Sequence, residues 1–305
     1  MCGISGLFGY LETSPPVDRN SLDRMTRAMI PRGPDGDGTW ISGENGVGFG
    51  HRRLSIIDLT DAAAQPMVLD GNRLSITYNG EIYNFRALRE ELESAGAKFV
   101  SGSDTEVLLH LYDRHGTSMV EKLRGMFSFA IFDRDKRGLF LARDGFGIKP
   151  LYYTDDGATF RFASQVKALL AGGGIDNTPS ATGQAGFYVW GYVPEPWTMF
   201  ENIRALPAGC TLWIDGNGAR TPMRYFDVTD VLHAAADSPS DWAQAELRDA
   251  LLDTLKQHLV ADVPVGAFLS AGLDSATIVG LTSEIQDDAL RSVTLAFDEF
   301  NGTQF

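Results

Sequence analysis

Hydrophobic and polar residues alternate in short runs over the first two thirds of the chain, and glycine-rich turns separate these runs. Alternation with a period of two is typical of β-strands that bury one face. The pattern predicts strands over residues 46–51, 74–78, 127–133, 139–143 and 160–164. This part of the chain therefore favours an antiparallel sheet architecture.

Helical spacing of apolar residues occurs at three places in the same region and predicts helices over residues 20–30, 84–95 and 104–115. The second helix would begin after Asn84 and end at Gly96. For the third, the sequence SDTE over 103–106 is typical of a capping box, in which the first and fourth side chains bond each other's backbone N–H groups. Gly116 would close that helix.

The last third of the chain has a different pattern. The predicted elements are a linker over 231–241, a helix over 242–259, a strand over 263–269, the loop SAGLDS over 270–275, a helix over 276–285 and a strand over 292–300. The near-continuous apolar run of the first strand is typical of a strand buried on both faces of a parallel sheet. This order predicts an α/β domain. Because two strands cannot cover the faces of such a sheet, the sequence predicts that this second domain is truncated.

The composition excludes some classes of partner. The 305 residues are enough for two domains, and 44% of them are hydrophobic, which is ample for a core. The chain carries 26 basic and 40 acidic side chains, a formal charge of -14. That balance argues against a general surface for nucleic acid or anionic membranes, which draws on clustered Lys and Arg.

The cysteine and hydropathy content indicates a cytosolic protein. Cys2 and Cys210 are the only cysteines, too few for a disulfide framework, so a reducing compartment is favoured. The five histidines show no metal-ligand spacing with either cysteine. No basic segment precedes the first apolar stretch, and no apolar run approaches the roughly 18 residues needed to cross a bilayer.

The chain begins MCGISGLFGY, and Cys2 is open to two interpretations. In one of them, Cys2 is simply the first residue of an edge strand. In the other, loss of Met1, which the small side chain of Cys2 permits, leaves a thiol and a free α-amine on one residue. An amine with a pKa near ~8 can accept a proton at neutral pH, and an ionised thiol is a strong nucleophile. Gly3 would let a substrate carbonyl approach the backbone closely.

Four further stretches carry candidate chemistry, each with a structural alternative. In HRRLSIID (51–58) two arginines end a strand, and an arginine fork suits a substrate carboxylate. In YNGEIYN (78–84) the Asn-Gly pair by itself favours a hairpin turn. GSDTE (102–106) is compatible with both a capped helix and a ligand role. ARDGFGIKPLYY (142–153) is compatible with a tight turn between strands, with Lys149 solvated.

The motifs stand in the order seen in class II glutamine amidotransferases. They are MCGISGLFGY, RGPDGDG, HRRLSIID, YNGEIYN, GSDTE, GMFSFAIFD and ARDGFGIKPLYY. SAGLDS after a strand resembles the pyrophosphate loop of asparagine synthetases, so the chain resembles the N-terminal half of the glutamine-hydrolysing asparagine synthetase family. The resemblance implies an α+β fold. A four-layer αββα N-terminal nucleophile hydrolase domain would span residues 2–218, and residues 219–305 would hold a linker and the start of an α/β synthetase domain of the adenine nucleotide alpha-hydrolase-like (PP-loop) type.

For the first domain, the resemblance implies that Cys2 attacks the side-chain amide of glutamine, forms a thioester and releases ammonia, with no cofactor. The Asn79 side chain and the Gly80 N–H would form the oxyanion hole, where one donor is typically worth about 10²–10³ in rate. The implied substrate-binding residues are Arg53 for the glutamine α-carboxylate, and Glu81 and Asp104 for its α-ammonium.

For the second domain, the resemblance implies an ATP site at a helix N-terminus. The implied ATP-binding residues are Leu269, Ser270, Gly272, Asp274, Ser275 and Leu295, with Asp274 also near Mg²⁺. The implied activity is that of asparagine synthase (glutamine-hydrolysing), a ligase. Aspartate would be activated as β-aspartyl-AMP and attacked by ammonia from the first domain. Glutamine, aspartate and ATP would be the small-molecule partners, and a homodimer is compatible with the resemblance.

Three features depart from the family pattern. Ala271 replaces the first of two successive glycines, and if that position needs a positive φ, alanine would cost about 1–2 kcal/mol and weaken phosphate binding. Pro31 stands where histidine is expected. The rest of the synthetase half is absent, so we expect glutaminase chemistry with at most weak ATP binding.

Two other functions stay open at this stage. The first is another class II amidotransferase, similar to β-lactam synthetase or with a different acceptor. The second is a non-catalytic module that binds glutamine or docks a partner, which would show thermal stabilisation by glutamine without ammonia release. The intact set of Cys2, Asn79 and Gly80 argues against the second.

Overall fold

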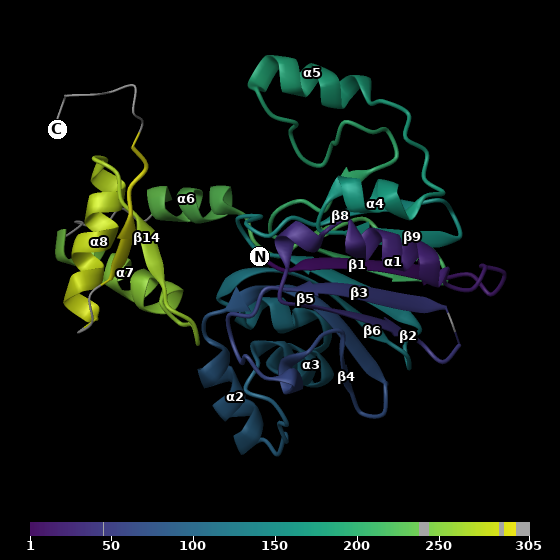
Figure 1. The fold of residues 1–305 in the computed structure, drawn as a ribbon, viewed down its shortest axis with the longest axis horizontal. Coiled ribbons are helices and arrows are strands. Elements are labelled where there is room, and N and C mark those ends of the chain that lie inside the picture. The colour runs from purple at the N-terminus through teal and green to yellow at the C-terminus, as the bar shows by residue number, and fades with distance from the viewer. Residues whose placement is uncertain (45, 238–243, 287–289, 297–305) are drawn as a thin grey trace. The chain divides into compact units, whose positions relative to one another are not determined.

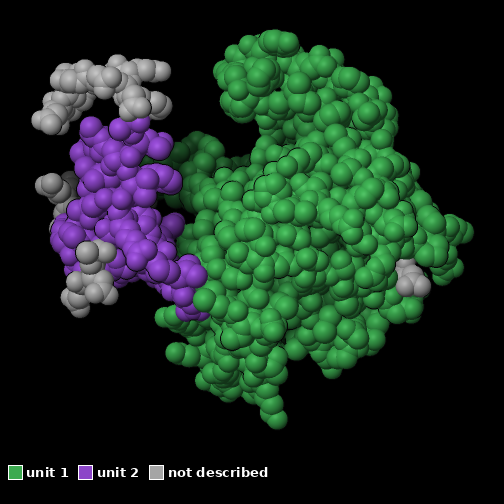
Figure 2. Space-filling view, in the orientation of Figure 1, with its two compact units in different colours: residues 1–236 green, residues 237–305 purple. Residues whose placement is uncertain are grey.

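A computed structural model of the chain describes residues 1–44, 46–237, 244–286 and 290–296. These residues fall into two compact units, residues 1–236 and 237–305, coloured separately in Figure 2. Each unit is described by itself below. No described helix is both long and apolar enough to cross a membrane.

The first unit is built on two antiparallel sheets. The strand order of one sheet is β10 (Arg204–Ala205), β8 (Tyr152–Asp155), β9 (Thr159–Ala163), β1 (Gly3–Gly9), β3 (Val47–Arg53) and β2 (Gly36–Ile41). The strand order of the other is β12 (Gly218–Ala219), β11 (Cys210–Asp215), β7 (Gly138–Arg143), β6 (Gly125–Asp133), β5 (Leu74–Ile82) and β4 (Met67–Leu69), and β13 (Met223–Arg224) pairs with β11. The five strands predicted from alternation all lie in these sheets.

Helices cover the outer face of each sheet and complete four layers in the order αββα (Figure 1). α1 (Arg19–Arg27) and α4 (Val166–Gly172) pack on the sheet that contains β1. α2 (Phe85–Ser94) and α3 (Asp104–His115) lie on the side of β5. The remaining helices of this unit are α5 (Ala181–Trp190), α6 (Val228–Asp237, which ends at the unit boundary) and the short 3-10 helices η1 (Ile30–Arg32), η2 (Asp61–Ala63) and η3 (Gly116–Lys122).

The main core lies between the two sheets. Side chains from both inner faces fill it, among them Ile4, Phe8, Phe49, Phe132, Leu141, Phe162, Leu212 and the second cysteine, Cys210. A second cluster, which includes Leu7, Leu22 and Met25, packs α1 and α4 against the other side of β1. Alternate residues of β1 therefore enter two different cores, as the period of a strand requires.

β1 is a central strand, which contradicts the interpretation of Cys2 as the start of an edge strand. It pairs with β3 on one side and β9 on the other. Near its start, Ile4 N donates to Ser164 Oγ at 3.0 Å, and Ser164 N donates to Ile4 O at 2.9 Å. These contacts hold the first residues of the chain in a fixed place, which ordinary termini lack.

Only half of the predicted capping box forms. Ser103 is the N-cap of α3 and its hydroxyl accepts from Thr105 N at 3.1 Å. The Glu106 carboxylate accepts from Val100 N and Ser101 N, at 2.9 and 2.8 Å, and not from the cap residue. The capping half is thus confirmed, whereas the acidic half orders the loop that precedes the helix.

The second unit contains α7 (Gln244–His258), β14 (Gly266–Phe268), α8 (Leu273–Ile285) and β15 (Arg291–Val293). β14 and β15 pair in parallel, which confirms the predicted α/β order. The predicted burial of the first strand is wrong among the described residues, because Phe268 is 76% exposed. α8 also begins three residues earlier than predicted, within the loop motif. The described part of the predicted linker, residues 231–237, is helical and belongs to α6. Residues 238–241 of that linker and residues 297–300 of the predicted strand over 292–300 lie outside the described residues.

Candidate active site

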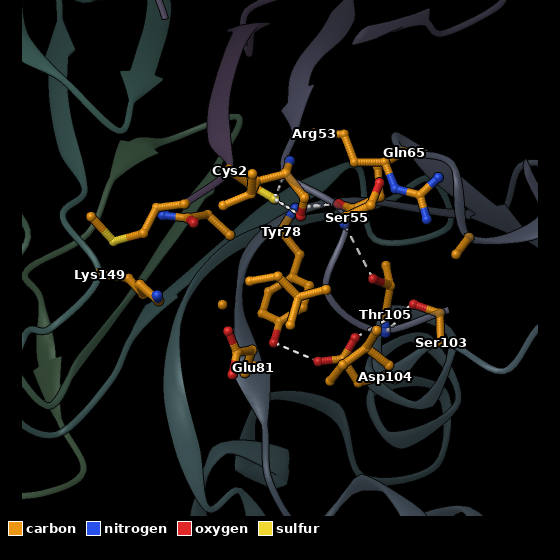
Figure 3. Close-up of a pocket in the computed structure, with 17 residues that line it drawn as sticks. Cys2, Arg53, Ser55, Gln65, Tyr78, Glu81, Ser103, Asp104, Thr105 and Lys149 are labelled. Carbon is orange, nitrogen blue, oxygen red and sulfur yellow. Dashed lines mark hydrogen bonds between the residues drawn. The ribbon is translucent and has the colours of Figure 1, made fainter. Parts of the chain in front are cut away.

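A pocket opens at the end of the first unit where β1 begins and where β3 and β5 end (Figure 3). Its volume is about 50 Å³. The lining residues are Met1, Cys2, Arg53, Leu54, Ser55, Ile56, Ile57, Ala63, Gln65, Tyr78, Asn79, Gly80, Glu81, Ser103, Asp104, Thr105 and Lys149. All six residues proposed for the glutaminase site are therefore brought to one pocket, although up to 102 positions separate them in the sequence, from Cys2 to Asp104.

Cys2 is held at the mouth of this pocket by the end of β3. Its Sγ accepts from Leu54 N at 3.3 Å and lies 3.5 Å from Leu54 O, to which the thiol donates. Arg32 Nε donates to Cys2 O at 2.9 Å. Burial raises the pKa of the Cys2 thiol, and the hydrogen bond from Leu54 opposes that rise.

Two neighbours of Cys2 bear on its chemistry. Met1 lines the pocket and is 51% exposed. Burial lowers the pKa of its α-amine below the usual value, and the nearby cations Lys149 and Arg32 act in the same direction. Pro31 lies at the start of η1, where proline's missing N–H removes no helical hydrogen bond, so this departure from the family pattern fits the local backbone.

Asn79 and Gly80 lie inside β5 and not in a hairpin turn, so the turn suggested by Asn-Gly is wrong. They pair with Ser128 and Phe127 of β6. The Asn79 side chain is 1% exposed, and neither its amide nitrogen nor its amide oxygen has a hydrogen-bond partner among the described residues. A buried amide without partners is costly, so it indicates a missing ligand.

The backbone of Gly80 faces away from β6. Both backbone groups of Phe127, the residue opposite, are used by Asp144, because Asp144 N donates to Phe127 O at 2.8 Å and Phe127 N donates to Asp144 Oδ2 at 3.2 Å. Gly80 and Phe127 are therefore a non-hydrogen-bonded pair of the antiparallel ladder. In such a pair, the backbone N–H of Gly80 points away from β6. A Cβ on Gly80 would lie 2.3 Å from Met126 O, so only glycine fits.

The backbone N–H groups of Tyr78 and Ile82, two positions before and after Gly80, show which groups lie on this side of β5. Tyr78 N donates to Gln65 Oε1 at 2.7 Å, and Ile82 N donates to Asp104 Oδ2 at 3.0 Å. Residues 78, 80 and 82 share one side of the strand. The Gly80 N–H is therefore directed to the pocket, between these two occupied donors.

Asp104 lies in the first turn of α3 and is 4% exposed. Its Oδ2 also accepts from the Tyr78 hydroxyl at 2.8 Å. Burial raises the pKa of this carboxyl, while its hydrogen bonds oppose the rise. In Figure 3, Asp104 and Glu81 lie below Cys2, with Arg53 on the right and Lys149 on the left.

Arg53, the last residue of β3, is tied to the loop that follows it. Its Nη1 donates to Thr60 O at 3.0 Å and its Nη2 donates to Asp58 O at 2.5 Å. Asp58 Oδ2 accepts from Gly102 N at 2.7 Å, which joins this loop to the start of α3. The guanidinium thus lines a pocket wall whose backbone is fixed.

The lining residues to which the sequence assigned no role include Ser55, Gln65, Tyr78 and Lys149. The structural alternative for ARDGFGIKPLYY left Lys149 solvated, and this is wrong because Lys149 is only 4% exposed. Pro150 and the apolar run that follows were the available signal, since they place the lysine against the core. Gln65 and Ser55 lie in loops with no such signal.

The loop SAGLDS forms the start of α8 in the second unit. Ser270 Oγ and Ser275 Oγ lie 2.9 Å apart, and Ser270 N donates to Ser275 Oγ at 3.1 Å. Gly272 is the N-cap with φ −77°, and Ala271 is not among the described residues with positive φ. The energetic cost that alanine would have at a positive φ therefore does not apply to Ala271.

The other residues assigned to nucleotide binding come together at one edge of the two-stranded sheet. Leu269 N donates to Val293 O at 2.9 Å, which places Leu269 and Leu295 just beyond the carboxyl ends of parallel strands. Asp274 lies in the first turn of α8 and is exposed. The described residues contain no cluster of three or more His, Cys, Asp or Glu suited to a metal. A Cβ on Gly272 would lie 3.2 Å from Ser270 Oγ, so the loop is closely packed at the N-terminus of α8.

Comparison with known proteins assigns families to both parts of the chain. The profile of the glutamine amidotransferase domain matches residues 1–226, and that of asparagine synthase matches residues 246–304. Asparagine synthetase [glutamine-hydrolyzing] 1 of Bacillus subtilis is 38% identical over 98% of this chain and 46% of its own length. Asparagine synthetase B [glutamine-hydrolyzing] of Escherichia coli is 35% identical over 93% of this chain and 45% of its own. The chain spans about half the length of the curated relatives it matches.

Solved structures share the fold. Glutamine phosphoribosylpyrophosphate amidotransferase from Bacillus subtilis superposes with a TM-score of 0.53 and 20% identity, over 96% of this chain and 65% of that one. At this identity the likeness concerns the fold alone. Together with the observed layer order, it confirms the four-layer αββα fold of N-terminal nucleophile hydrolases.

Proposed function

The chain belongs to the glutamine amidotransferase domain family, and on that premise we propose that its first unit hydrolyses glutamine to glutamate and ammonia at Cys2. The observation that supports this most is the meeting of a thiol and an unpartnered amide in one pocket. The Cys2 thiol and the buried Asn79 amide both line it, and no described group satisfies that amide. A carbonyl oxygen that gains negative charge during attack would be the partner that Asn79 lacks.

The first half of the proposed reaction forms a thioester. Removal of Met1 would place the α-amine on Cys2 and enlarge the pocket that Met1 lines. The amine takes the thiol proton, and the sulfur forms a bond to the side-chain carbonyl carbon of glutamine. The carbonyl oxygen accepts the electron pair and is stabilised by the Asn79 amide and the Gly80 N–H. The amine then passes its proton to the nitrogen, the C–N bond breaks and ammonia leaves.

The second half restores the enzyme. The neutral amine takes a proton from water, whose oxygen attacks the thioester carbon. The C–S bond breaks, glutamate leaves and the sulfur recovers a proton. One residue thereby serves as nucleophile and base, and the histidines of the chain have no part in this scheme.

The charges around the pocket match those of free glutamine. We assign Arg53 to the α-carboxylate, and Glu81 and Asp104 to the α-ammonium. Burial raises the pKa of the Asp104 carboxyl by disfavouring its charged form. A cation placed beside this carboxyl would stabilise the charged form. The N-terminus of α3 and the Tyr78 hydroxyl support its charged form.

The finer activity of the whole protein is also a proposal. We assign residues 2–218 to the glutaminase domain and residues 219–305 to the linker and the first part of an asparagine synthetase domain. Ser270, Gly272 and Ser275 would hold ATP phosphates, Asp274 would accept Mg²⁺, and Leu269 and Leu295 would flank the nucleotide. ATP would supply an activated aspartate β-carboxylate. In full-length relatives of this kind, ammonia from the first unit would complete asparagine.

Ammonia release from glutamine tests the proposal directly. The intact mass first shows whether Met1 has been removed. We expect wild-type chain to release ammonia and Cys2→Ala to release none, while Cys210→Ala, which removes the other cysteine from the core, stays active. Glutamine that raises the Tm without ammonia release would instead indicate a binding module. Equal activity in Cys2→Ala would overturn the assignment of the nucleophile.

A further inference from the structure

Lys149 places a buried ammonium group in the wall of the pocket that holds Cys2. Its side chain is 4% exposed and lines the pocket, to the left of Glu81 in Figure 3. Among the described residues, no carboxylate forms an ion pair with the Lys149 ammonium. Burying an ammonium without a direct ion pair is unfavourable, so the position calls for an explanation beyond stability.

The backbone of Lys149 is held from both sides. Lys149 N donates to Asp144 Oδ2 at 2.9 Å, and Arg143 Nε donates to Lys149 O at 2.9 Å. Arg143 Nη2 also donates to Gly147 O at 2.8 Å, which closes the turn. Gly147 has φ +64°, a conformation that favours glycine. Two buried charged residues therefore build the turn that delivers the ammonium to the pocket.

We propose that Lys149 sets the protonation state of the nucleophilic residue, its positive charge favouring an ionised thiol and an unprotonated amine on Cys2. This inference rests on the proposed glutaminase function. A nearby cation stabilises a thiolate and disfavours a second ammonium. Both effects move the reactive state, in which thiol and amine share one proton, to lower pH. Lys149 acts here through charge, as a positioning residue for a proton and not as a group that attacks substrate.

The charges around the pair act in both directions. At the α-amine of Met1, the N-terminus of the unprocessed chain, Arg32 adds to the positive field of Lys149, and Glu81 opposes it. Lys149 opposes the rise in the Cys2 pKa that burial causes, and Asp104 adds to it. Burial lowers the pKa of Lys149 itself, whereas Glu81, Cys2 and Asp144 favour its charged form. Arg32 also interacts electrostatically with Cys2, so its charge acts in the same direction as that of Lys149.

The pH dependence of kcat/KM for glutamine tests the inference in the full chain after Met1 removal. We compare wild type with Lys149→Met, Lys149→Gln and Lys149→Arg, and use Lys167→Met as a control that removes an exposed lysine of α4. We expect the acidic limb of the kcat/KM profile to move up by about 1 pH unit in Lys149→Met and Lys149→Gln. A shift of this size is typical of the loss of one nearby charge. Lys149→Arg and Lys167→Met should keep the wild-type limb.

A second measurement does not depend on activity. The rate of Cys2 alkylation by iodoacetamide, followed by peptide mass spectrometry so that Cys210 is counted separately, reports the thiolate fraction at each pH. We expect the pH profile of Cys2 alkylation to move up by the same amount in Lys149→Met. If this variant does not fold, Lys149→Gln, which keeps a polar side chain of similar length, tests the same shift.

The two proposals fail in different ways. If wild type hydrolyses glutamine and the uncharged variants keep both profiles, the role of Lys149 is wrong and the glutaminase function stands. If wild type releases no ammonia but alkylation shifts as expected, Lys149 tunes the thiol and the glutaminase function is wrong. A rise in KM alone, with unchanged profiles, would make Lys149 a substrate-binding residue and overturn the inference.

Discussion

The hydroxyl of Tyr78 donates a hydrogen bond of 2.8 Å to Oδ2 of Asp104, and both residues are buried. The contact joins β5, which carries the proposed oxyanion hole, to the first turn of α3. Burial raises the pKa of Tyr78 well above its usual value, and the charge of Asp104 and this hydrogen bond act in the same direction, so the hydroxyl keeps its proton. Tyr78 therefore positions the carboxylate proposed to receive the glutamine ammonium.

We expect Asp104→Asn to weaken glutamine binding and stabilise the fold at neutral pH. The folded pKa of Asp104 is raised, so the folded chain retains a proton at pH values where the unfolded chain has lost it. Stability from this group is complete below the unfolded pKa and is lost as the pH rises through the folded pKa. Asparagine can accept the same hydrogen bonds without a charge.

The measurements for Asp104→Asn are KM for glutamine and the Tm at pH 4 and pH 7. KM should rise at least tenfold with a smaller change in kcat, and the gain in Tm should be larger at pH 7. Asp176→Asn, a change at an exposed surface carboxylate, is the control and should leave KM unchanged. An unchanged KM in Asp104→Asn would contradict its role at the ammonium.

We expect Asn79→Ala to lower kcat by about 10²–10³ with little loss of stability, because its buried amide has no protein partner to lose. Removal of an unsatisfied amide relieves about 1–3 kcal/mol, which offsets the small cavity left behind. Steady-state ammonia release and urea unfolding measure the two effects. A variant that is strongly destabilised would show that the amide is bonded within the fold.

Gly80→Ala should abolish activity and destabilise the first unit, because the new Cβ would meet the backbone oxygen of Met126 at 2.3 Å. Overpacking of this kind typically costs about 1–3 kcal/mol. Gly43→Ala provides the matched control, since a Cβ there meets nothing within 4 Å. Thermal unfolding of both variants compares them, and equal Tm values would contradict the close packing of β5 on β6.

His51 should make the protein sensitive to acid. It is fully buried, its Nε2 lies 3.1 Å from Tyr78 O, and burial lowers its pKa from 6.5 to about 3. Below pH 6.5 the unfolded chain gains a proton here that the folded chain does not, so stability falls as the pH falls toward 3. The slope is at most about 1.4 kcal/mol per pH unit.

His51→Gln, which can still donate to Tyr78 O, should flatten the fall in unfolding free energy between pH 6.5 and pH 4. Denaturant unfolding at several pH values measures it. His233→Gln, on the exposed face of α6, should retain the wild-type slope. The same slope in all three proteins would assign the acid sensitivity to other groups.

By itself, the sequence determined five strands and three helices of the first unit, together with the candidate residues of its site. Alternation over 127–133 and caps such as Ser103 depend on neighbours a few positions away, which the sequence contains. The order of motifs also singled out Cys2, Arg53 and Asp104, and the structure places all three in one pocket.

Tertiary structure alone decided the features that depend on distant partners. β1 is central because β9, more than 150 residues later, pairs with it. Pairing with β6 overrides the local preference of Asn79–Gly80 for a turn. Lys149 is buried because Arg143 and Asp144 fold its turn against the pocket. Hydrogen bonds and burial between segments far apart in sequence leave no local pattern, so these features follow only once the chain is folded.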